Sequence, residues 1–164
     1  MSSFPEDNYL FAEQLIIDRL KQVMPPEINV GSIGDYADLA QSKVAFPNVS
    51  VLYLGDDPVI HSANTPGQRG VNTAGNGIAC QVVQYWGVVV GTKEPTTAKT
   101  GFASRTEGGK LMLKVLKVLQ GFEILPCMYL TRGLFRGNSS IYNESGYTFL
   151  TAQFNLTLDV VGEK

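Results

Sequence analysis

Within residues 147–160, the side chains alternate between apolar and polar without a break from Leu150 to Val160. Side chains of a β-strand point alternately to opposite faces, so this pattern predicts a long strand with one apolar face and one hydrated face. Such a strand belongs in an antiparallel or mixed sheet that is covered on one side. The polar residues suit a surface that is either wet or covered by another protein, and they are Thr151, Gln153, Asn155, Thr157 and Asp159.

Length and composition predict a single folded domain. The 164 residues are 44% hydrophobic and 17% charged, which is fewer charges than usual. The first residues lack the basic start and apolar run of a secretion signal, and no apolar stretch approaches the roughly 20 residues that cross a bilayer. Cys80 and Cys127 lie in apolar surroundings, which favours two buried free thiols in a cytosolic protein, with a disulfide as the open alternative.

Hydrophobic periodicity predicts two helices. The first covers residues 9–24, with a start capped by Asp7 or Asn8 and a stop at a Pro-Pro pair. The second covers residues 110–120 and opens after a Gly-Gly pair. It is apolar except for one narrow stripe, so we expect it to be buried over most of its circumference. The stripe consists of Lys110, Lys114 and Lys117.

Strands are expected at residues 49–54, 78–92, 124–131 and 147–160. The first ends at a turn signature, residues 55–58, and the second carries Gly87 as a candidate bulge. Strands that follow one another without an intervening helix favour antiparallel pairing. The expected fold class is α+β: a mixed, largely antiparallel β-sheet with two main α-helices packed on one face.

Three long connections are expected, near residues 56–77, 93–109 and 132–146. Loops beyond about 12–15 residues are uncommon in compact domains unless they bind something or are disordered. Three of them in one small domain predict interaction loops that become ordered in an assembly. For any single loop, a plain surface loop remains an equal alternative.

The charge is uneven along the chain. Residues 1–82 hold four basic and nine acidic residues, a net charge of −5, whereas residues 83–164 hold nine basic and six acidic residues, a net charge of +3. Solvated surface alone accounts for such a split. The alternative is a dipolar subunit whose acidic side meets the basic side of a neighbour in a head-to-tail ring.

Basic residues gather between positions 69 and 136, with nine basic and three acidic residues in that segment. No aromatic-interleaved motif or reading helix accompanies them, so we expect electrostatic contact with a DNA channel or an acidic partner ring, without sequence reading. The lysine stripe of the second helix is the weakest part of this set. The candidate lumen-facing or partner-facing residues lie on loops: Arg69, Lys93, Lys99, Arg105, Arg132 and Arg136.

The sequence offers no catalytic constellation. One His and two distant Cys cannot supply a structural zinc tetrad, and His61 is expected to be solvated. The Gly-rich stretch 67–77 lacks the spacing of a phosphate-binding loop and precedes a strand. No catalytic, metal-binding or cofactor-binding residue is therefore assigned. A small enzyme or ligand-binding domain, with a pocket between loops 56–77 and 132–146, is the less favoured alternative.

Most of the chain resembles the tail terminator, or tail-completion, proteins of long-tailed bacteriophages, especially the branch found with contractile tails and Mu-like prophages. The resemblance rests on an opening amphipathic helix, an apolar strand after a proline, a long strand, an apolar helix and the final alternating strand. The first four segments read EQLIIDRLK at 13–21, FPNVSVLY at 46–53, QVVQYWGVVV at 81–90 and GKLMLKVLKVLQG at 109–121.

The resemblance implies a structural virion protein without enzymatic activity or cofactor. Family members form a homo-hexameric ring that caps the tail tube, ends its polymerisation, contacts the sheath in contractile tails and meets the neck or connector protein. Genomic DNA passes through the lumen, and no membrane is involved. The implied location is the tail or neck of a virion assembled in the host cytoplasm. Another neck or tube component is the alternative, and Thr151, Gln153, Asn155 and Thr157 are the candidate subunit interface.

Overall fold

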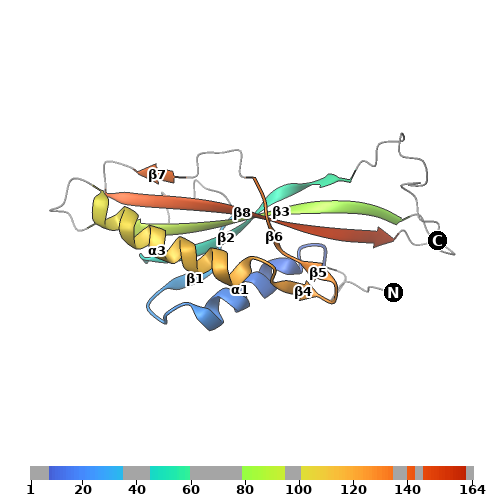
Figure 1. The fold of residues 1–164 in the computed structure, drawn as a ribbon, viewed down its shortest axis with the longest axis horizontal. Helices are drawn as coiled ribbons and strands as arrows, with labels where there is room; N and C mark the ends of the chain where they lie inside the picture. The colour runs from blue at the N-terminus through green and yellow to red at the C-terminus, as the bar shows by residue number, and fades with distance from the viewer. Residues whose placement is uncertain are drawn as a thin grey trace.

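The computed structural model describes residues 8–34, 45–59, 79–94, 101–134, 140–142 and 146–161. It confirms the α+β class, because two helices lie on one face of a mixed, mostly antiparallel sheet (Figure 1). The helices are α1, Ala12–Val23, and α3, Phe102–Leu119. The strands are β1, Asn29–Ser32; β2, Asn48–Pro58; β3, Ala79–Lys93; β4, Glu123–Leu125; β5, Met128–Tyr129; β6, Thr131–Arg132; β7, Ser140–Tyr142; and β8, Tyr147–Val161.

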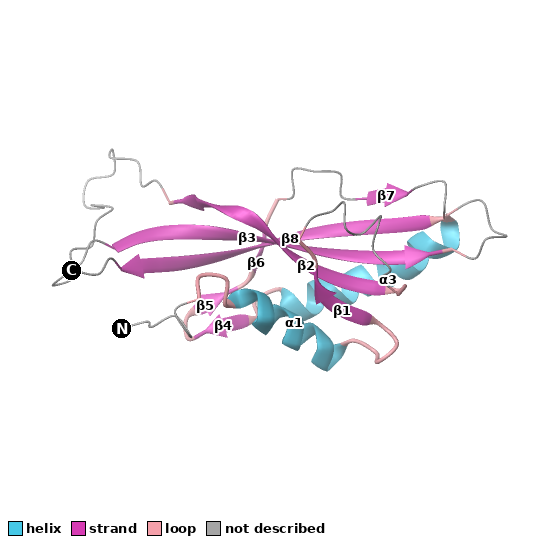
Figure 2. Ribbon diagram, turned by 180° about the vertical axis from the view of Figure 1, so that it is seen from behind, coloured by secondary structure: helices cyan, strands magenta, loops and turns pink. Residues whose placement is uncertain are grey.

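Three long strands form the body of the sheet. The strand order is β1-β2-β3-β8-β6, and β7 also pairs with β8. β3 pairs antiparallel with both β2 and β8, whereas β1 runs parallel to β2 (Figure 2). β4 and β5 form a separate two-stranded hairpin. Because β3 and β8 stay in register from Lys93–Tyr147 to Ala79–Val161, they form one continuous twisted ribbon.

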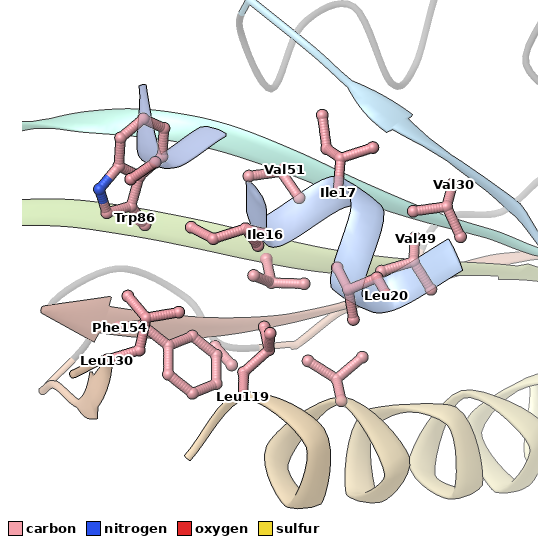
Figure 3. Packing of buried hydrophobic residues seen from close by; sticks show 14 of the residues in the cluster. Ile16, Ile17, Leu20, Val30, Val49, Val51, Trp86, Leu119, Leu130 and Phe154 are labelled. Atoms are coloured by element: carbon pink, nitrogen blue, oxygen red, sulfur yellow. The ribbon is translucent and has the colours of Figure 1, made fainter. Parts of the chain in front are cut away.

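The main core lies between this sheet and the two helices. α1 contributes Ile16 and Leu20, which are fully buried with Val49 of β2 and Phe154 of β8 (Figure 3). Burying a side chain of this size contributes about 1.5–3 kcal/mol to stability. The cluster also contains Trp86, whose indole N–H donates to Oε1 of the Gln84 side-chain amide at 3.2 Å.

A second, smaller core lies on the opposite face of the sheet. It joins Ile33 to Leu52 of β2, Val89 of β3 and Phe149 of β8. Gly91 lets this core pack closely on the sheet, because a Cβ at this position would lie 2.7 Å from Asn48 Oδ1 and 2.9 Å from a ring carbon of Phe46. The sequence predicted padding on one side of the sheet alone, and this cluster corrects that prediction.

The first helix begins later than predicted, and its expected cap is wrong. Phe11 occupies the N-cap position and makes no side-chain capping hydrogen bond. The Asn8 side chain instead accepts a bond from the Leu10 N–H at 2.9 Å, which shapes the turn before the helix. The segment is tied to the sheet by Gln84, whose amide donates to the Tyr9 carbonyl at 2.8 Å. The predicted end before the two prolines is confirmed, since α1 ends at Val23.

The second helix begins two turns earlier than predicted. Gly108 lies inside α3, where a Cβ would approach Thr92 Oγ1 at 3.2 Å, so the glycine permits close packing and does not start the helix. The true start is held by the buried carboxylate of Glu94, which accepts bonds from the N–H groups of Gly101 at 2.6 Å and Ala103 at 3.3 Å. A carboxylate at a helix N-terminus satisfies groups that would otherwise be unpaired. The predicted loop at 93–109 is correspondingly shorter.

Two strand boundaries and one predicted bulge also differ from the structure. The turn expected at 55–58 belongs to β2, which continues past a bulge between Tyr53 and Gly55. Gly87 is not bulged; a Cβ there would lie 2.6 Å from a Leu52 methyl carbon. The strand expected at 124–131 is divided into β4, β5 and β6, because a turn intervenes at Cys127, whose φ is 67°. That cysteine is exposed, which contradicts the prediction that it is buried.

Candidate interaction surfaces

At one end of the molecule, the three central strands present a face that neither of the described helices covers. Beyond the bulge, Asp57 lies opposite Val83, which in turn lies opposite Thr157. Opposed residues share a face, and this face is opposite to the one carrying Leu156 and Leu158 in the helix-side core. We call this surface the distal face, and it consists of Asp57, Gln81, Val83, Tyr85, Asn155, Thr157 and Asp159.

Two exposed carboxylates flank the distal face. Asp57 accepts a hydrogen bond from the Tyr85 hydroxyl at 3.0 Å, and Asp159 accepts one from the Gln81 amide at 3.0 Å. Both donors are neutral groups, so these bonds position the carboxylates without neutralising their charge. Val83, Tyr85 and Asn155 between them are half-buried, and Thr157 is exposed. The surface therefore combines a partly apolar centre with negative charge on its two outer strands.

The predicted subunit-interface residues divide into two groups. Thr151 is only 6% exposed within the subunit itself, so it contributes little surface to a neighbour. Gln153 and Asn155 are half-buried and joined by a hydrogen bond of 3.0 Å from the Gln153 amide. β6 runs beside them, and the Gly133 N–H donates to the Gln153 carbonyl at 2.9 Å. Thr157 is the one exposed residue of the four, and it belongs to the distal face.

The described members of the basic set do not form one patch. Lys93 ends β3 and Arg105 lies in the first turns of α3, so both lie at the end where α3 begins (Figure 1). The Lys93 ammonium lies 5.0 Å from the centre of the Tyr147 ring. Arg132 lies on β6, donates to the Gln153 carbonyl at 3.1 Å and stacks over Phe154. Arg69, Lys99 and Arg136 lie outside the described residues.

α3 exposes an apolar ridge that the sequence did not predict. Phe102 is 69% exposed and Leu113 is 53% exposed, although the helix was expected to be mostly buried. With 3.6 residues per turn, the two side chains lie within about 20° of each other around the helix. Thr106 between them donates its hydroxyl to the Phe102 carbonyl at 2.9 Å, and Gly109 adds no side chain.

Basic side chains flank this ridge on both sides. Arg105 lies on one flank, and Lys110 and Lys117 lie on the other, all of them exposed. Together with Phe102 and Leu113 they form what we call the α3 ridge. The lysine stripe in the sequence indicated the basic part of this surface. Phe102 and Arg105 were missed because the helix was predicted to begin at residue 110. The opposite side of α3 is packed on the sheet through Leu111, Val115 and Leu119.

The described residues do not contain three His, Cys, Asp or Glu side chains placed to hold a metal ion. A shallow groove lies between the end of α1 and β1, lined by Lys21, Pro25 and Asn29 among others. It is separate from the pocket expected between loops 56–77 and 132–146, most of which lies outside the described residues. Over the part of the chain that is described, neither helix has the length and apolar character needed to span a membrane.

Comparison with known families identifies the family of the chain. The model of the family described as phage tail terminator protein matches residues 6–161. The chain belongs to this family. The resemblance found in the sequence is thereby confirmed at the level of the family, and the chain is a structural protein of a bacteriophage tail. A search of curated proteins finds no match.

Proposed function

We propose that this terminator-family protein forms a homo-hexameric ring that caps the tail tube. The ring would stop further addition of tube protein and offer a surface to the neck or connector protein. In a contractile tail, as in the Mu-like branch, it would also hold the last layer of sheath. The observation that carries the proposal is the family match over nearly the whole chain. Two oppositely charged surfaces on one subunit are consistent with a ring.

Genomic DNA would pass through the lumen of this ring. The supporting observation is positive charge at the end where α3 begins, on Lys93. Arg105, on the α3 ridge, is the partner-facing member of the set. Attraction of this kind acts on the phosphate backbone, is screened by salt and reads no sequence. Arg132 and the remaining loop residues, Arg69, Lys99 and Arg136, complete the proposed set. A structure of the neck in which all of these side chains lie on the outer wall would contradict the lumen proposal.

Deleting the gene from its phage tests the capping function. Without a cap the tube has no stop signal, so we expect overlong tails that carry no heads, visible by negative-stain electron microscopy. Supplying the intact chain from a plasmid should restore uniform tails, and the protein should then be found in purified virions assembled in the host cytoplasm. Headless tails of normal length would instead indicate a neck component. Unchanged particles would contradict the proposal.

A further inference from the structure

We infer that the α3 ridge of one subunit docks on the distal face of a second copy of this chain. The inference rests on the proposed ring and names the contact that would close it. The two surfaces belong to opposite ends of the long axis: α3 begins at one end, and β8 finishes at the other (Figure 1). Two different patches facing opposite ways produce a head-to-tail contact, which closes into a ring when its rotation permits.

The charges of the two surfaces are complementary. α3 carries four basic residues and one acidic residue, a net charge of +3. The distal face presents Asp57 and Asp159 from its two outer strands, each exposed and held by a neutral donor. Unlike patches on the two partners orient the encounter and disfavour the reverse arrangement, in which like charges would meet.

The dimensions of the two surfaces also match. Asp57 lies on β2 and Asp159 on β8, two strand spacings apart, which is about 10 Å across the sheet. A helix with its side chains is about 10–12 Å wide, so it would bring basic flanks over both carboxylates. Along the axis, Phe102 and Leu113 are about 16 Å apart, and the strand from Gln81 to Tyr85 extends about 13 Å.

Apolar contact supplies the centre of the interface. Phe102 and Leu113 would lie over the half-buried Val83 and Tyr85, with Thr157 beside them. An apolar centre with a charged rim is the usual anatomy of a protein interface. The α3 helix of each subunit covers one side of its own sheet. In the ring, the α3 helix of a neighbour would cover the other side, at the distal face.

A charge-swap experiment in the deleted phage tests this contact. One variant reverses both flanks of the ridge through Arg105→Glu, Lys110→Glu and Lys117→Glu, and the other reverses the distal face through Asp57→Lys and Asp159→Lys. Each alone places like charges in every contact, so we expect loss of normal-length tails to the level of the deletion. Expressed together, the two variants alternate around the ring with opposite charges in every contact, and most tails should regain normal length.

Matched controls separate charge from position. Lys21→Glu reverses an exposed charge in the last turn of α1, and Glu27→Lys reverses one in the turn that follows it; both should leave tail length unchanged. The inference is wrong if either reversed variant works alone, or if both fold but fail together. Circular dichroism of each purified full-length variant establishes folding.

Cross-linking tests the contact independently of tail length. In a chain whose exposed native thiol is removed by Cys127→Ser, the pair Leu113→Cys and Val83→Cys should form a ladder of disulfide-linked subunits when virions are oxidised. Each single cysteine variant in the same background should match the Cys127→Ser chain. Lys21→Cys with Val83→Cys is the position control and should give no added ladder. A ladder in the absence of any tail-length phenotype would keep the contact and refute the capping function. Normal capping without a ladder would refute the contact.

Discussion

The two halves of the β3–β8 ribbon are covered differently. In the half next to the start of α3, Val88 and Val89 are both fully buried although they point to opposite faces of the sheet. In the other half, Leu156 and Leu158 are fully buried, whereas Thr157 between them is exposed. One half is therefore a three-layered core, and the other is a sheet with one face open.

The difference comes from residues outside the ribbon. Ile33 and Phe46 lie far from β8 in the sequence, yet they complete the second core around Val89 and Phe149. Equivalent covering is absent from the distal face among the described residues. A polar residue in an alternating strand can therefore be buried or exposed, depending on which distant segment reaches it. We regard the open half as the part of the sheet completed by assembly.

The largest expected difference in stability comes from placing a lysine, in each half, on the face of the sheet opposite the two helices. Val89→Lys buries an ammonium group without a partner, so we expect a loss of at least about 3 kcal/mol in the free energy of unfolding. Val83→Lys lies on the half-exposed distal face and should cost less than about 1 kcal/mol. Urea denaturation of both variants measures the difference. Equal losses would show that the two halves are covered alike.

Smaller changes in the free energy of unfolding are expected when either of two asparagines is replaced by leucine, and the two changes should have opposite signs. Asn48 is fully buried beside Gly91, and neither of its side-chain polar atoms has a hydrogen-bond partner among the described residues. Asn48→Leu removes these unsatisfied groups and should raise the free energy of unfolding by about 1 kcal/mol. Asn155→Leu in the distal half removes the acceptor of the Gln153 amide and should lower it by about 0.5–1.5 kcal/mol. Thermal melts that shift in the same direction for both variants would contradict this reasoning.

The smallest expected effect is a loss of stability at high pH. Burial, followed by a hydrogen bond to Asp56, raises the pKa of Tyr9 and of Tyr53 above the usual value. The unfolded chain then ionises first, so stability is fully present below about pH 10 and falls as the pH rises through the folded-state pKa values. Tyr53→Phe should flatten this decline in urea melts between about pH 9 and 11. An unchanged slope would contradict the assigned shift.

Local patterns predicted much of the fold. The alternation of 147–160 gave β8 within one residue, and the two prolines gave the end of α1. The errors arise where a distant group decides a boundary. The start of α3 depends on the Glu94 carboxylate, and Gly108 is set by packing against Thr92, so neither is visible in the local sequence.

The exposure of the candidate interface residues was predicted in part. The exposure of Thr157 follows from the alternation of β8 alone, because the described helices do not cover that face of the strand. Thr151 is covered by tertiary structure that the pattern of its own strand does not encode. The exposure of Phe102 depends on the unpredicted first turns of α3, so the ridge could not be identified before the helix start was known.

The most direct test of the central claim is a cryo-electron-microscopy structure of the tail end in intact virions. We expect six copies of this chain in a ring on the last layer of tube protein. In each copy the distal face, including Asp57 and Asp159, should be covered by the α3 ridge of its neighbour. A ring in which the distal face points into solvent, or virions that hold a single copy of the chain, would contradict the claim.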